Sequence, residues 1–83
     1  MMISRDDLIR ILGSEIVTQA ENLPDEEFEE RKWDNLSALL SACEKLAHTP
    51  QFEARRSFLK GLHPNLQILL IRHLFYQEKM TAV

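Results

Sequence analysis

The chain has 83 residues, enough for one domain and too few for two, and a chain of this size buries only a modest core. With 45% hydrophobic and 28% charged residues and a net charge of -3, its composition excludes a disordered segment and argues against a dedicated nucleic-acid-binding protein. The single cysteine, the lack of a signal-peptide pattern and the lack of an apolar run near the roughly 20 residues of a membrane span together predict a cytoplasmic protein.

The first predicted helix covers about residues 5–22. Ser4 is a favourable N-cap, and Asp6 and Asp7 place negative charge in the first turn. Gly13 lies inside this helix, where glycine lowers helix stability by about 1 kcal/mol relative to alanine. We expect that another helix crosses closely at this point, which would explain why a glycine is present. The apolar residues of the helix recur at steps of three or four: Leu8, Ile9, Leu12, Ile16, Ala20 and Leu23.

The second predicted helix follows Pro24 and covers about residues 25–47. The five-residue step from Phe28 to Trp33 does not keep a strict helical phase, so we expect an irregularity near Trp33. The helix has an apolar seam, which Leu39 and Leu46 widen, and we expect the residues of this seam to pack in the core. The seam consists of Trp33, Leu36, Leu40, Cys43 and Ala47.

Two shorter patterns complete the predicted fold. Thr49 and Pro50 form a start signal and Gly61 a stop signal, which predicts a third helix over about residues 50–60. The fourth helix is predicted over about residues 64–79, and no segment alternates as a strand does. The sequence therefore predicts a single all-α domain, residues 1–83, built as a compact bundle of four helices with short turns.

The last helix is apolar in every direction around its axis, so it is either wrapped by the other helices or covered by a second chain. Three short helices can enclose a fourth only partly. On the second interpretation, the side that carries Leu69 and Tyr76 stays open, with Arg72 beside it, and binds another protein or a second copy of this chain. On the first interpretation, the same residues belong to the core.

Charge is divided unevenly along the chain. Residues 1–44 hold eleven acidic and four basic residues, whereas residues 45–83 hold two acidic and six basic ones. In the basic half, Arg55, Arg56 and Lys60 form a stripe on the third helix that suits the polar rim of a protein interface. The alternative is a nucleic-acid-associated regulator that contacts phosphates through this half.

An acidic and aromatic patch is the second candidate for recognition. Its carboxylates favour a basic partner, while its aromatic side chains suit a groove. The alternative is a solvated helix start in which Glu27 pairs with Arg31 and Glu29 with Lys32, and in which the aromatic residues cap the core. The patch consists of Glu26, Phe28, Glu29, Glu30 and Trp33.

The sequence offers no convincing catalytic or metal-binding pattern. The three histidines, His48, His63 and His73, have no second ligand at helical spacing, and Cys43 lies on an apolar seam. We therefore expect no enzyme, no cofactor, no metal and no small-molecule substrate. The predicted function is that of a small non-enzymatic module, an adaptor, regulator, inhibitor or chaperone-like partner, that binds another protein or forms a homodimer.

Overall fold

The computed structural model describes residues 3–82, with side chains described for residues 3–75. This part of the chain is helical, without a strand. The expectation of an all-α fold is confirmed, whereas the expected count of four helices is wrong. The helices are α1 (Arg5–Leu12), α2 (Ser14–Asn22), α3 (Asp25–Asp34), α4 (Leu36–Ala47), α5 (Phe52–Lys60) and α6 (Pro64–Ala82).

The first additional break occurs at Gly13, where φ is 94° and ψ is 154°. This conformation is open to glycine and strained for a residue with a Cβ atom. The Gly13 amide donates to the carbonyl oxygen of Ile9 at 2.8 Å, which ends α1, and α2 begins at the next residue. A Cβ built on Gly13 would meet nothing beyond its chain neighbours within 4 Å. The glycine therefore makes a corner between two helices, and the expected close helix crossing is wrong.

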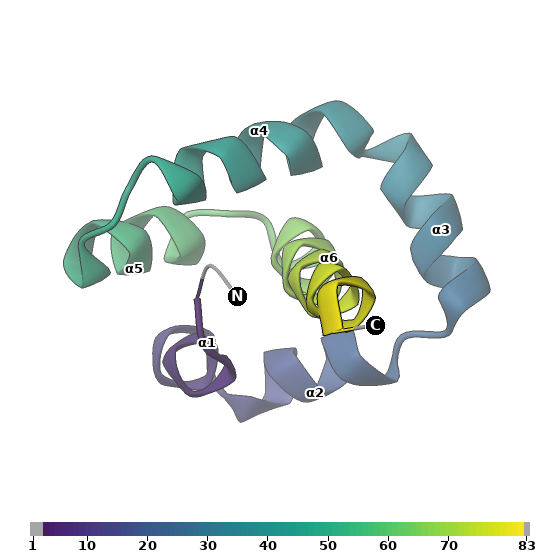
Figure 1. The fold of residues 1–83 in the computed structure, drawn as a ribbon, viewed down its shortest axis with the longest axis horizontal. Helices are drawn as coiled ribbons and strands as arrows, with labels where there is room; N and C mark the ends of the chain where they lie inside the picture. The colour runs from purple at the N-terminus through teal and green to yellow at the C-terminus, as the bar shows by residue number, and fades with distance from the viewer. Residues whose placement is uncertain (1–2, 83) are drawn as a thin grey trace.

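The second additional break occurs at Asn35, two residues after Trp33, where φ is −126° and ψ is 22°. The Asn35 side-chain Nδ2 donates to the carbonyl oxygen of Arg31 at 2.9 Å, and its backbone amide donates to the same oxygen at 3.1 Å. These bonds close the last turn of α3 and leave α4 free to start in a new direction. Figure 1 shows the resulting corner between α3 and α4.

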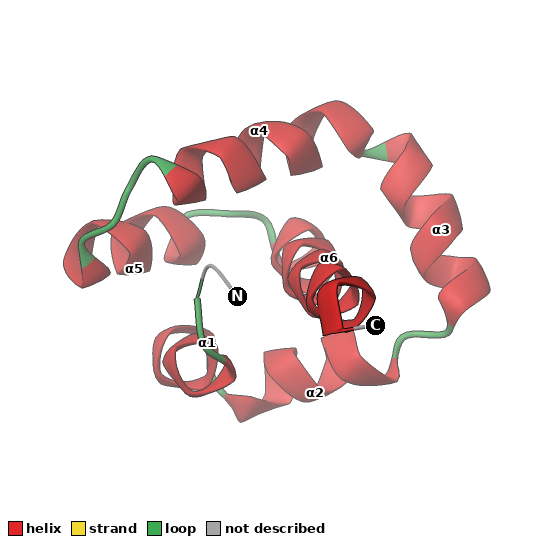
Figure 2. Ribbon diagram, in the orientation of Figure 1, coloured by secondary structure: helices red, strands yellow, loops and turns green. Residues whose placement is uncertain are grey.

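The six helices are arranged with α6 in the middle. Figure 1 views α6 along its axis, with α1 to α5 around it. Helix α6 packs against α2, α3 and α4, and α1 packs against α2 and α5. The loops between the helices are short (Figure 2). This arrangement corresponds to the interpretation in which the last helix is wrapped by the others.

The core is centred on three consecutive residues of α6, Leu69, Leu70 and Ile71, whose side chains are all fully buried. Three consecutive residues spread over most of a helix circumference, so all three can be buried only in a helix that is enclosed on several sides. Each such side chain contributes about 1.5–3 kcal/mol through burial. The other helices supply further fully buried side chains: Leu8, Val17, Ala20, Leu39, Leu46 and Leu59.

One polar side chain, Gln67, is also buried in the core. Its Nε2 atom donates to the carbonyl oxygen of Leu59, near the C-terminus of α5, at 2.8 Å. The bond satisfies a buried amide and a helix-end carbonyl together, so it fixes the end of α5 against α6.

Candidate functional site

The described part of the α6 strip that was expected to stay open is buried. Leu69 is fully buried among the other helices, so the expectation that it lies on an exposed surface is wrong. The physical reason is the division of the predicted long helices at Gly13 and Asn35, which lets α2, α3 and α4 each pack against α6 from a different direction. Tyr76, the other apolar residue of this strip, lies outside the residues whose side chains are described.

Arg72, expected at the edge of a binding surface, lies instead at the C-terminus of α2. Its Nη1 atom donates to the carbonyl oxygens of Ala20 at 2.9 Å and Glu21 at 3.2 Å, and also to that of Leu23. Its Nη2 atom pairs with the carboxylate of Asp25, and only 14% of the Arg72 side chain is exposed. Arg72 therefore supplies the donors that the end of α2 lacks.

The basic stripe on α5 is smaller than the sequence suggested. Arg55 is half-buried, and its guanidinium donates to the carbonyl oxygens of Thr49 and Leu46 at the C-terminus of α4. Arg56 and Lys60 are exposed, and Arg56 lies 3.9 Å from a carboxylate oxygen of Glu53. Two of the three predicted bases are thus on the surface, while the third closes a helix.

The acidic and aromatic patch is exposed except for Phe28. Phe28 is buried with 3% exposure, which matches the alternative in which the aromatic residues cap the core, whereas Trp33 does not match it. Trp33 is 65% exposed, and the three carboxylates Glu26, Glu29 and Glu30 are exposed on the same outer side of α3. The structure therefore keeps these four residues of the patch together on the surface.

The charges within this patch are partly paired, as expected. Lys32 Nζ lies 3.0 Å from a carboxylate oxygen of Glu29, and the same ammonium lies 5.5 Å from the ring centroids of both Phe28 and Trp33. Arg31 binds Glu27 on the inner side of the helix and donates to Asn65 Oδ1 at 3.0 Å. No ion pair within the described residues involves Glu26 or Glu30, so their charges are available to a partner.

The apolar seam predicted for the core of the second helix lies largely on the surface. Leu40 is 52% exposed and Ala47 is exposed, while Leu36 and Cys43 are half-buried. The core side of α4 is instead formed by its other apolar row, Leu39, Ala42 and Leu46. We call the surface row the outer stripe, and its residues are Trp33, Leu36, Leu40, Cys43 and Ala47.

Apart from Trp33, which belongs to the acidic and aromatic patch, the outer stripe is a functional candidate that sequence reasoning missed. Both apolar rows of α4 have helical spacing, and burial of either one would satisfy the pattern. The signal that could have found the stripe is the presence of two apolar rows, because a helix in contact with one core needs only one. The count shows that one row is left for another use, but it does not show which row that is.

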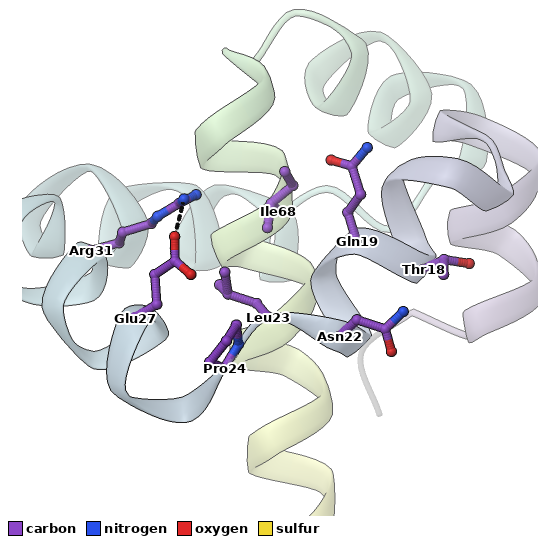
Figure 3. Close-up of a pocket in the computed structure, with 8 residues that line it drawn as sticks. All are labelled: Thr18, Gln19, Asn22, Leu23, Pro24, Glu27, Arg31 and Ile68. Atoms are coloured by element: carbon purple, nitrogen blue, oxygen red, sulfur yellow. Dashed lines mark hydrogen bonds and ion pairs between the residues drawn. The ribbon is translucent and has the colours of Figure 1, made fainter.

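A groove of about 400 Å³ lies between α2 and α3. Figure 3 shows polar side chains of α2 on one side, the Glu27–Arg31 pair on the other, and Ile68 of α6 between them. Among its described lining residues there is no histidine or cysteine, and the carboxylate of Glu27 is bound by Arg31. The groove offers hydrogen-bonding groups without a nucleophile and base in contact. Its lining comprises Thr18, Gln19, Asn22, Leu23, Pro24, Glu27, Arg31 and Ile68.

Burial is the main cause of the pKa shifts of two side chains that can take part in proton chemistry. Burial raises the pKa of the Cys43 thiol above its ordinary value, which disfavours the reactive thiolate. Burial also lowers the pKa of the His73 imidazole, and the charge of Lys32 acts in the same direction. Within the described residues, no group of three histidine, cysteine or acidic side chains is placed to hold a metal ion.

Comparison with known proteins gives no match: no family model, curated protein or solved structure resembles the chain. In the part of the chain covered by the structure, no helix combines the length and the apolar character needed to cross a membrane.

Proposed function

We propose that this protein is a small non-enzymatic interaction module that binds another protein through the outer stripe of α3 and α4. The observation that carries the proposal is the exposure of Trp33 and Leu40, the two large apolar side chains that stand out on the surface of the described residues. Tryptophan is prominent among the residues that dominate the binding energy of protein interfaces. This location replaces the last helix as the proposed binding surface.

The packing of α4 supports this proposal. Leu39 and Leu46 are fully buried against the core, so Leu40 is not needed to hold α4 in place. An exposed leucine alone is common on protein surfaces. Here, however, Leu40 is one member of a regular row that continues through half-buried Leu36 and Cys43. A row of this kind buries its remaining apolar surface when a second helix packs along it.

Site-specific photo-crosslinking tests the proposal. A benzoylphenylalanine placed at Leu40 is expected to capture a discrete protein in the native cells, because it lies within the interface. The same probe at Ala54, which is exposed on α5, serves as the matched control and should not capture that protein. Equal capture from both positions, or none from Leu40, would overturn the proposal.

Light scattering separates a foreign partner from a second copy of the chain. A homodimer formed through the outer stripe would also satisfy the proposed function, and it is expected to revert to a monomer in the variant Leu40→Asp. Circular dichroism of that variant should retain the helical spectrum, because Leu40 is half exposed and makes a small contribution to the core.

A further inference from the structure

Taking the proposed function as its basis, we infer that the partner on the outer stripe is a basic amphipathic helix of another protein. Negative charge lies on both sides of the exposed apolar side chains. Glu29 and Glu30 precede Trp33 by four and three residues, so they lie one turn from it on the same side of α3, and Glu26 lies one turn further away. Glu44 follows Leu40 by four residues and is exposed on α4. Carboxylates therefore flank both of the exposed apolar side chains.

The basic residues closest along the chain neutralise this surface only in part. Lys45 lies 5.0 Å from the ring centroid of Phe58, so it is directed toward α5. Lys32 lies against Glu29 with its side chain only 21% exposed, and Arg31 is held by Glu27 and Asn65. Glu30 and Glu44 form no ion pair with any described residue. A partner with lysine or arginine beside its apolar contacts would complement these charges, whereas an acidic partner would be repelled.

The spacing of the outer stripe also suits a partner helix. Successive members of the outer stripe are three, four, three and four residues apart, the alternation that a coiled-coil seam presents to its partner helix. The corner at Asn35 turns the chain away after Trp33 (Figure 1), so a straight partner helix would follow α4. Trp33 would then contact the end of that helix, and Leu36, Leu40, Cys43 and Ala47 would contact its length.

A second copy of the chain fits this surface less well. A two-fold dimer brings the same patch together from both subunits, which places two sets of carboxylates in one interface. The basic residues Arg56 and Lys60 of a second copy lie on α5, whose buried or half-buried Phe52, Phe58 and Leu59 face its own core. Helix α5 thus presents positive charge without an exposed apolar row beside it.

Binding of designed peptides tests this inference, and Trp33, the only tryptophan in the chain, reports it by fluorescence. The probe is a helical peptide of roughly three heptads with leucine at the seam positions and lysine at the flanking positions. Its matched control carries glutamate in place of lysine, and neither peptide contains tryptophan. The lysine peptide is expected to shift the Trp33 emission to shorter wavelength and to bind more than about tenfold more tightly than the glutamate peptide.

Three variants show whether the peptide binds through the proposed surface. Leu40→Asp should abolish binding of the lysine peptide, and replacement of Glu26, Glu29 and Glu30 by glutamine should weaken it and reduce its salt dependence. Glu15→Gln, an exposed carboxylate on α2, is the matched control and should leave affinity unchanged.

Equal binding of the two peptides, no binding of the lysine peptide, or binding that survives Leu40→Asp would overturn the basic-helix inference. These outcomes are distinguishable from failure of the proposed function, because crosslinking from Leu40 captures a partner of any charge. Capture from Leu40 together with failure of the lysine peptide removes only the inference about the partner. Failure of both experiments removes the binding role of the outer stripe as well.

Discussion

The Nη1 atom of Arg72 lies 2.9 Å from the carbonyl oxygen of Ala20, a residue 52 positions earlier in the chain. This bond joins the middle of the central helix to the C-terminus of α2, where backbone acceptors have no partner within the helix. Arg55 does the same for α4 through the carbonyl oxygen of Leu46 at 3.3 Å. Two of the basic residues that gave the C-terminal half its positive charge therefore bind the ends of helices. They do not form an open binding surface, whereas α3 and α4 carry exposed apolar side chains.

Replacement of Arg72 by methionine should lower the free energy of unfolding by about 2–3 kcal/mol, because methionine keeps the apolar stem and leaves the carbonyl acceptors without a charged donor. Urea denaturation followed by circular dichroism measures the loss. Arg56→Met, at an exposed arginine with a long ion-pair contact, is the matched control and should stay within about 0.5 kcal/mol of the unmodified protein. Equal losses in the two variants would contradict a special role for Arg72.

Replacement of Gly13 by alanine should destabilise the protein by about 1–3 kcal/mol, because the positive φ at this position strains a residue with a Cβ atom. Gly61→Ala is the matched control. Gly61 has φ −80° and ψ −10°, and a Cβ there would make ordinary contacts of 3.5 Å, so this variant should be neutral or slightly more stable. Thermal unfolding of both variants checks the difference, and a neutral Gly13→Ala would show that the α1–α2 corner is not strained.

The helix boundaries illustrate what local sequence can predict. Ser4, which accepts a hydrogen bond from the Asp7 amide at 3.1 Å, and Pro64, the first residue of α6, both act locally, and both starts were predicted. The corners at Gly13 and Asn35 were placed inside longer helices, although the irregularity expected near Trp33 lies two residues from the corner at Asn35. A single glycine or asparagine is tolerated within a helix, and whether the chain turns there depends on how both flanking helices pack against α6.

The candidate site was predictable only in part, for a related reason. The exposed positions of Glu26, Glu29 and Glu30 follow from their place on one side of α3. Trp33 was also assigned to the apolar seam expected in the core, and its exposure corrects that assignment. Which of the two apolar rows of α4 faces the core does not follow from local sequence, because it depends on the direction in which α4 leaves Asn35. The direction set by that corner turns Leu39 toward the core and leaves Leu40 outside.

The neighbouring residues Leu39 and Leu40 provide a direct test of this choice. Leu39→Ala should cost about 2–5 kcal/mol, because it leaves a cavity at a fully buried position. Leu40→Ala should change the free energy of unfolding by no more than about 0.5 kcal/mol, because the side chain is half exposed. Chemical denaturation of the two variants measures both values. A larger loss for Leu40→Ala would place the outer stripe in the core.

Stability should decrease as the solution becomes mildly acidic, because of His73. Burial and Lys32 lower the pKa of His73 in the folded protein, so the unfolded chain, with its ordinary value of 6.5, takes up a proton at higher pH. Protonation then favours unfolding, and the free energy of unfolding should fall as pH decreases through about 6.5 toward the folded pKa. His73→Gln should flatten this dependence in urea titrations between about pH 7.5 and 5. His48→Gln, at an exposed histidine that ends α4, is the control, and an equal flattening there would contradict the assignment to His73.

Cys43 should report occupation of the outer stripe through its rate of alkylation. Iodoacetamide reacts with the thiolate, and the raised pKa of this half-buried thiol keeps the thiolate scarce, so the folded protein should react more slowly than the urea-unfolded chain.

Cys43 follows Leu40 by three residues, so a helix bound along the stripe covers both side chains. The lysine peptide should therefore slow alkylation further in the unmodified protein and should have no effect in Leu40→Asp. If the peptide shifts Trp33 fluorescence while the alkylation rate of Cys43 stays constant, it contacts α3 without lying along α4, and the heptad register proposed for the interface is wrong.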